Sequence, residues 1–109
     1  MDDNPVIELV LYRLKEGADE ARFLKDADAL TDVLRTLPGF VSRRLLTAVE
    51  DGQWADLVEW RSMEEALRAA EVFPTLQEVE PLIETVNMTN VTMLHLAPKR
   101  SYKQVPSLP

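Results

Sequence analysis

The chain has 109 residues, which is the size of one domain, and a formal net charge of -7. That charge argues against nucleic acids and anionic membrane surfaces as partners, because both need clustered Lys and Arg. The chain contains no cysteine, so disulfides, thiolate nucleophiles and iron–sulfur clusters are excluded. An acidic N-terminus and the lack of an apolar stretch of about 18 residues predict a soluble, cytoplasmic protein.

The first half of the chain predicts a strand, a helix and a second strand. Residues 6–14 are rich in branched apolar side chains on both faces, which is typical of a central strand. Residues 18–37 repeat apolar side chains at steps of three and four, which predicts an amphipathic helix that a Pro-Gly pair ends. Residues 40–49 form the second strand, and its Arg44 is expected to pair with Asp56 across a hairpin.

The second half predicts another strand, helical segments and a last strand. An Asp-Gly turn leads into a strand over residues 54–61, and a capping box then begins a helix over residues 63–72. That helix is expected to turn Leu67 inward, among other apolar side chains. One or two further helical turns over residues 75–84 and a strand over residues 86–97 complete the order.

The order βαββαβ predicts an α+β, ferredoxin-like fold: a four-stranded antiparallel sheet with both helices on one face. We expect one domain over residues 1–97 and an extended, proline-containing arm over residues 98–109. The uncovered face of the sheet would carry Leu9, Leu11 and Leu57, and a contiguous apolar patch of that kind is rare on soluble monomers. The sequence therefore predicts a homodimer in which two sheets pack face to face.

Short segments at the strand ends and turns carry a family resemblance. They are YRLKEG at residues 12–17, Phe23, LPGFVSR at residues 37–43, DGQW at residues 51–54 and VEWRS at residues 58–62. In this arrangement the chain resembles the antibiotic biosynthesis monooxygenase-like proteins of the dimeric α/β-barrel superfamily. The resemblance implies a dimer whose two sheets close into a barrel, with a cleft in each subunit between helices and sheet. It also implies that an oxygenase of this type would need no bound cofactor.

Aromatic side chains are the candidate ligand-binding residues. The resemblance implies that a tryptophan at the end of the third strand lines the cleft, and Trp60 matches that position. Tyr12 is a candidate to hydrogen-bond a phenol or a carbonyl, and Trp54 and Phe73 are candidate aromatic lining. The alternative for both tryptophans is a purely structural role, in which each indole packs in the core.

His95 and Asp56 are the candidate catalytic residues. His95 is the only histidine, and its ordinary pKa lies near neutrality; it is expected on the strand face opposite Met88. Asp56 stands between two tryptophans on one strand face, where desolvation would raise its pKa and make it a general base. The alternatives are a satisfied core or interface histidine and a structural pair of Asp56 with Arg44. One histidine with scattered carboxylates predicts no metal site.

Two functions follow from these residues. The first is an enzyme that deprotonates a small aromatic or enolisable ligand and shields the anion, so that dioxygen can react with it without a cofactor. The second is a non-catalytic ligand-binding or stress-response protein whose dimer is the working unit. An open cleft with Trp60 and a titratable group favours the first; a cleft filled by Phe23, Leu30, Leu67 and Phe73 favours the second.

Overall fold

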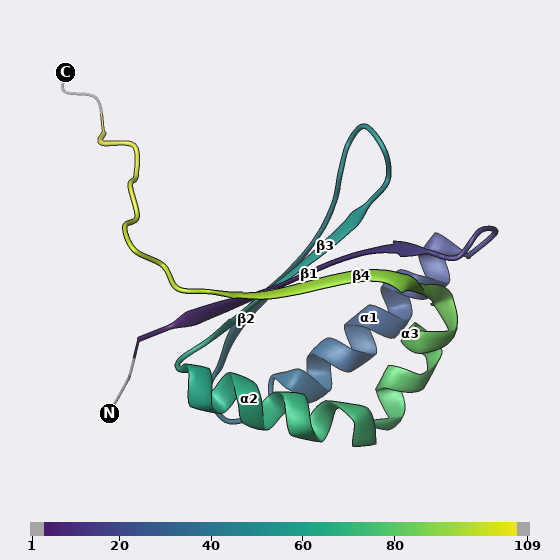
Figure 1. Cartoon of the computed structure of the whole chain (residues 1–109), viewed down its shortest axis with the longest axis horizontal. Helices are drawn as coiled ribbons and strands as arrows, with labels where there is room; N and C mark the ends of the chain where they lie inside the picture. Colours follow the sequence, from purple (N-terminus) through teal and green to yellow (C-terminus); the bar gives the residue numbers. More distant parts are fainter. Residues whose placement is uncertain (1–3, 107–109) are drawn as a thin grey trace.

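The computed structural model describes residues 4–106 and contains one antiparallel sheet with every helix on the same face (Figure 1). The strands are β1 (Val6–Leu14), β2 (Phe40–Thr47), β3 (Trp54–Trp60) and β4 (Val86–Leu96), in the order β2-β3-β1-β4. The helical segments are α1 (Glu20–Leu34), α2 (Met63–Val72), η1 (Phe73–Thr75), η2 (Gln77–Val79) and α3 (Glu80–Thr85). All three strand pairs are antiparallel, so the predicted ferredoxin-like fold is confirmed.

Side-chain caps set the starts of the two long helices. The Asp19 carboxylate accepts a hydrogen bond from the Arg22 backbone N–H at 3.2 Å, and α1 therefore begins later than the predicted residue 18. The Ser62 hydroxyl oxygen accepts from the Glu65 N–H at 3.2 Å, as the capping-box spacing predicts. The predicted continuation of α1 to residue 37 is wrong, because α1 ends at Leu34 and the chain reaches β2 through turns.

The inward face of α2 is made of alanines. Ala66 and Ala69 are buried, whereas Leu67 is 49% exposed. The prediction that Leu67 points inward is therefore wrong. Small side chains on the inner face let α2 lie close to β1 and β3, which it contacts.

The register between β2 and β3 decides which arginine faces the helices. The turn between these strands closes with a hydrogen bond from the Ala48 N–H to the Gln53 carbonyl at 2.7 Å. In the register that follows, Arg43 lies on the same sheet face as Asp56, and Arg44 lies on the opposite face. The predicted pair of Arg44 with Asp56 is therefore wrong by one residue, and Arg43 is the partner.

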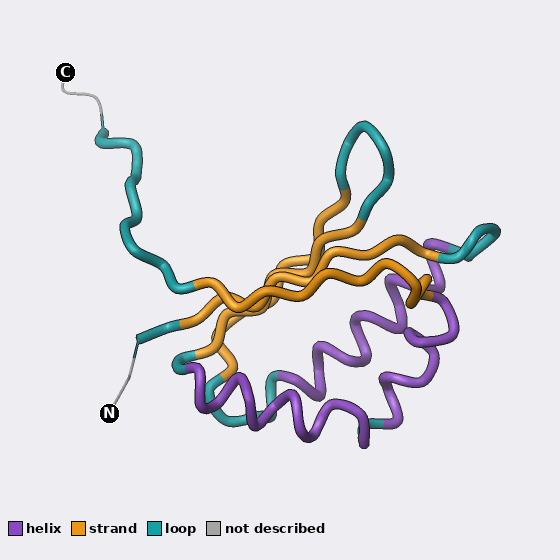
Figure 2. The backbone as a smooth tube through the Cα atoms, in the orientation of Figure 1, coloured by secondary structure: helices purple, strands orange, loops and turns teal. Residues whose placement is uncertain are grey.

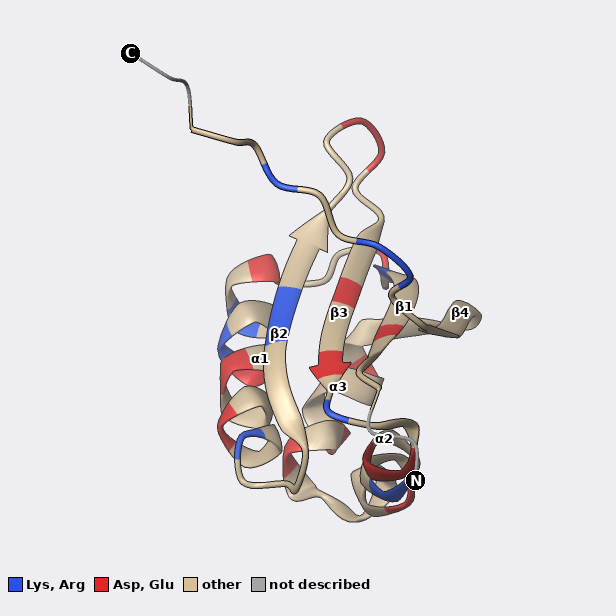
Figure 3. Cartoon of the chain, turned by 90° about the vertical axis from the view of Figure 1, so that its left-hand side faces the viewer, with Lys and Arg blue, Asp and Glu red and all other residues tan. Residues whose placement is uncertain are grey.

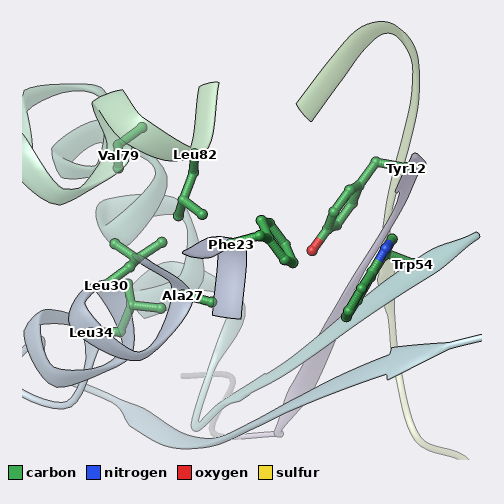
Figure 4. Packing of buried hydrophobic residues seen from close by; sticks show 8 residues of the cluster. All are labelled: Tyr12, Phe23, Ala27, Leu30, Leu34, Trp54, Val79 and Leu82. Carbon is green, nitrogen blue, oxygen red and sulfur yellow. The ribbon is translucent and has the colours of Figure 1, made fainter. Parts of the chain in front are cut away.

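The core lies between the sheet and the helices. Its larger cluster, shown in Figure 4, comprises Tyr12, Phe23, Ala27, Leu30, Leu34, Trp54, Val79 and Leu82. The stripe predicted for α1 supplies Phe23, Ala27, Leu30 and Leu34 to this cluster. A smaller cluster comprises Val6, Val58, Trp60, Ala66 and Ala69. The predicted inner face of β3 is thus confirmed, since Trp54, Val58 and Trp60 are all buried.

The other face of the sheet carries no described helix (Figure 2). Leu46, Leu94 and Leu96 of this face are 36%, 47% and 41% exposed. Residues 97–106 follow β4 without helix or strand and run away from the sheet (Figure 1). Among the helices of residues 4–106, none has the length and apolarity to cross a membrane.

Candidate functional site

A cavity of about 400 Å³ lies between the inner sheet face and the helices. Every side chain that α1, α2, α3 and the short turns between them contribute to its wall is apolar. The sheet contributes the polar groups, which are Glu8, Tyr12, Arg43, Asp56 and Trp60. This volume falls within the range of small-molecule sites, about 300–1,000 Å³. The cavity therefore has one apolar wall and one wall that can form hydrogen bonds.

Arg43 and Asp56 form a nearly buried ion pair on that wall. The Arg43 Nε–H donates to Asp56 Oδ1 at 3.0 Å, and a second guanidinium N–H donates to Asp56 Oδ2. Arg43 also donates to the Ala27 carbonyl at 3.1 Å and to Thr31 Oγ1 at 2.8 Å, both on α1. Figure 3 shows basic and acidic positions side by side on β2 and β3. Arg43 thus occupies both carboxylate oxygens of Asp56 and joins the sheet to α1.

Glu8 and His95 form a second polar pair, between β1 and β4. They are direct cross-strand partners, and His95 Nε2 lies 3.2 Å from Glu8 Oε2. Their side chains are 15% and 23% exposed. Burial raises the pKa of the Glu8 carboxyl, while the adjacent His95 acts in the opposite direction and Asp56 raises it further. Glu8 lines the cavity, and His95, its neighbour on β4, is not among the cavity-lining residues.

Tyr12 presents a hydroxyl to the interior. The residue is 6% exposed, and its ring meets Phe23 edge-on with centroids 6.2 Å apart. Figure 4 shows the hydroxyl directed toward Phe23. Burial, and then the negative charge of Asp56, raise the pKa of Tyr12 above its ordinary value. The hydroxyl therefore stays protonated at neutral pH and can donate a hydrogen bond.

Trp60 lines the cavity with a polar atom that lacks a partner. The residue is 2% exposed and meets Phe40 edge-on, with ring centroids 5.8 Å apart. Its Nε1 is buried without a hydrogen-bond acceptor among the described residues. Leaving a buried N–H unsatisfied costs about 1–3 kcal/mol, which a bound acceptor could recover.

The remaining candidates separate into two places. Phe73 lines the cavity and is 38% exposed. Trp54 packs on Phe23 in the core, with ring centroids 5.0 Å apart, and is not among the cavity-lining residues. The structure thus brings Trp60, Tyr12 and Phe73 to one cavity with Asp56. Sequence reasoning did not identify Arg43 as a site residue, because the strand register that places it is not encoded in local spacing. Alternation along β1 placed Glu8 on the same face as Tyr12, but Glu8 was not chosen as a site residue.

Solved oxygenase structures share this fold. SnoaB, a cofactor-independent oxygenase from Streptomyces nogalater, has a TM-score of 0.78 and 15% identity over 93% of this chain and 99% of that chain. A proposed antibiotic biosynthesis monooxygenase from Nitrosomonas europaea has a TM-score of 0.73 and 10% identity over 90% and 93% of the two chains. The sequence resembles the antibiotic biosynthesis monooxygenase-like proteins, and the chain has the fold of those proteins.

A third structure carries a ligand. It is a monooxygenase from the gene ActVA-Orf6 of Streptomyces coelicolor in complex with Nanaomycin D, with a TM-score of 0.68 and 14% identity over 94% of this chain and 95% of that chain. By sequence, no protein-family model matches the chain. No curated protein matches it either.

Proposed function

We propose that this chain, which has the fold of the antibiotic biosynthesis monooxygenase-like proteins, binds a small, largely apolar or aromatic molecule between its helices and its sheet. The observation that carries the proposal is the cavity of about 400 Å³, whose polar groups all come from one wall. A flat phenolic ligand would place its rings against the apolar helices and its oxygens toward the sheet. An apolar pocket with a few convergent polar groups is the arrangement typical of small-molecule sites.

Two donors on the sheet wall would hold the oxygens of such a ligand. The Trp60 N–H has no partner among the described residues, and the Tyr12 hydroxyl keeps its proton at neutral pH. Both are suited to a carbonyl or phenolate oxygen, because each donates a hydrogen bond and neither carries a charge that must be desolvated. Phe73 would add aromatic surface from the helical side.

The reaction we propose is oxygenation without a bound cofactor. The protein would remove a proton from the phenol and keep water away from the resulting anion, which then reacts with dioxygen. The sequence predicts Asp56 and His95 for proton transfer. Asp56 lies on the cavity wall, where Arg43 binds both of its oxygens, and His95 is connected to the cavity through Glu8.

The proposal includes a homodimer that buries the outer sheet face. This face exposes Leu46, Leu94 and Leu96, each by more than a third. Two such faces in contact would remove apolar surface from water at roughly 25 cal/mol per Å². The fold shared with SnoaB supports this arrangement, since the family that this chain resembles forms barrels from the sheets of two subunits.

Tryptophan fluorescence tests the binding site, because the chain has only two tryptophans. The variants Trp54→Phe and Trp60→Phe each leave one emitter, and alizarin serves as the phenolic probe. We expect alizarin to quench the Trp54→Phe protein strongly, since Trp60 lines the cavity, and the Trp60→Phe protein weakly. Free N-acetyltryptophanamide controls for absorption by the dye. Equal quenching of both variants, or no quenching, contradicts the site.

Oxygen uptake separates an oxygenase from a binding protein. With 1,4-dihydroxynaphthalene as substrate, the proposed enzyme consumes oxygen faster than the same solution without protein. The Trp60→Phe variant loses most of that increment. Binding of the probe without any increment in uptake would instead identify the non-catalytic ligand-binding alternative.

A further inference from the structure

The polar wall of the cavity contains one carboxylate that is free to take a proton. Asp56 accepts hydrogen bonds from Arg43 on both of its oxygens. Glu8 differs, because only Oε2 is engaged, by His95 at 3.2 Å. Glu8 Oε1 has no hydrogen-bond partner among the described residues, yet it is not one of the fully enclosed, unsatisfied atoms. Glu8 lines the cavity, and His95 leaves its Oε1 without a hydrogen bond.

His95 holds the carboxylate without reaching the cavity itself. The two residues are 87 positions apart in the chain and meet because they are cross-strand partners on β1 and β4. His95 thereby holds Glu8 Oε2 against β4. Glu8 Oε1 remains available, and the contact with His95 limits the orientation of the carboxylate.

We propose that Glu8 takes the proton from an acidic hydroxyl of the ligand and that His95 is the residue that positions it. The inference rests on the proposed function and narrows the ligand to a phenol or enol conjugated to a carbonyl group. Such hydroxyls are acidic enough to transfer a proton to a carboxylate of moderately raised basicity.

The step conserves atoms and electrons. The O–H bond of the ligand breaks, its electron pair stays on the ligand oxygen, and a new O–H bond forms at Glu8 Oε1. The Tyr12 hydroxyl can then donate to the anion. The step itself needs no oxidant.

The charges around Glu8 act in opposite directions. His95 on β4, which faces its other oxygen, lowers the pKa of Glu8, and Asp56 on β3 raises it. Arg43 on β2 also lines the cavity, where it is paired with Asp56. Tyr12 is neutral, and the helical wall brings no titratable side chain to the cavity. Burial raises the pKa of Glu8, which makes it a stronger base than an exposed glutamate.

The test measures the protonation state of bound alizarin by absorbance, at a pH where the free dye is mostly neutral. The variants are Glu8→Gln, which keeps the shape and removes the basic oxygen, and His95→Gln. The control is Glu59→Gln, which removes a carboxylate from the opposite sheet face of β3. Circular dichroism verifies that each variant folds.

We expect the wild type and Glu59→Gln to bind the dye as its anion. Glu8→Gln should bind it mostly neutral, with the ratio of anion to neutral dye lowered about tenfold or more, equivalent to one pKa unit. His95→Gln should shift the pH at which the bound dye ionises, by less than Glu8→Gln does. In weakly buffered wild-type solution, the anion should form without release of a proton, because the protein keeps it.

Several results would overturn the inference. Anion formation in Glu8→Gln equal to that of the wild type, a neutral dye in the wild type, or release of one proton per bound dye would each do so while leaving the cavity as a binding site. Absence of any binding to the wild type would overturn both this inference and the proposed function. The proton-release measurement needs only the wild type, so it can overturn the inference even if Glu8→Gln does not fold.

Discussion

At the residue scale, two neighbouring arginines have opposite surroundings. The Arg43 side chain is 7% exposed and contacts Asp56 and two groups of α1, whereas Arg44 is exposed on the outer face. A buried charge that loses its partner keeps its desolvation penalty, whereas an exposed charge is screened by water. Adjacent residues of one type therefore make a matched pair of variants.

We expect Arg43→Met to lower the free energy of unfolding by about 3–5 kcal/mol, because it leaves the Asp56 carboxylate buried and unpaired. Arg44→Met, measured in the Leu94→Glu background so that the outer sheet face stays exposed, should stay within about 0.5 kcal/mol of that background. Urea unfolding followed by circular dichroism measures both. Similar losses for the two variants would show that the ion pair between Arg43 and Asp56 does not cause the loss of unfolding free energy.

Because the Tyr12 hydroxyl is buried, we expect the protein to lose stability at alkaline pH. Burial raises its folded-state pKa above the ordinary value near 10, so its contribution is complete below pH 10 and is lost as the pH rises through the folded-state pKa. In urea unfolding from about pH 8 to about pH 11, Tyr12→Phe should show a flatter decline than the wild type above pH 10. Tyr102→Phe, which changes a residue 84% exposed, serves as control and should follow the wild type. If the unfolding free energy of Tyr12→Phe declined with pH as steeply as that of the wild type, the raised pKa of Tyr12 would be contradicted.

At the element scale, the turn before β2 lies against the start of α2. Gly39 has a φ of +85°, and its carbonyl accepts a hydrogen bond from the Arg61 N–H at 2.8 Å. A Cβ at Gly39 would come within 2.6 Å of the Glu65 Cβ. Glu65, whose backbone N–H donates to the Ser62 cap of α2, thus lies close to a position that both its conformation and its surroundings reserve for glycine.

Gly39→Ala should therefore destabilise the protein more than Gly17→Ala. Gly17 also has a positive φ, of +78°, but a Cβ there would meet nothing within 4 Å. We expect a loss of about 1–2 kcal/mol for Gly17→Ala from backbone strain alone. Gly39→Ala should cost at least about 1 kcal/mol more from overpacking. Chemical denaturation of both variants gives the comparison, and equal losses would mean that Glu65 moves aside freely.

Irregular pairing of strands also changes which side chains of an element face the cavity. The β1–β4 pairing shifts its register between Leu11 and Arg13. Strict alternation predicts Met88 on the face opposite Val91 and Met93, yet all three line the cavity. That prediction is wrong, because an irregular stretch in β4 changes which side chains face inward.

At the scale of the whole molecule, helices cover one sheet face and leave the other to solvent (Figure 2). Leu94 on the outer face is 47% exposed and Leu67 on the helical side is 49% exposed. The two leucines are similar in exposure but lie in different layers. A dimer built through the outer face would bury only Leu94.

Sedimentation velocity should therefore give the wild type the mass of two chains. Leu94→Glu should shift it to one chain, because a charge would be buried in the interface. Leu67→Glu is the control and should stay dimeric. A wild type that sediments as one chain at all concentrations would contradict the homodimer.

Local sequence signals determined the elements of this protein. The apolar stripe of α1, the Ser62 cap and the glycine turns act through neighbours three or four residues away, and the βαββαβ order limited the fold to few arrangements. The inner faces of β1 and β3 followed from alternation, which places Tyr12, Asp56 and Trp60 on the sheet face that lines the cavity.

Only the tertiary structure decided which partners those residues have. The β2–β3 register selected Arg43 over Arg44, and the β1–β4 pairing joined Glu8 to His95 across 87 positions. It also decided that Trp54 packs in the core while Trp60 borders the cavity. The physical reason is that a shift of one residue in a strand reverses every side chain, and no local pattern records that shift.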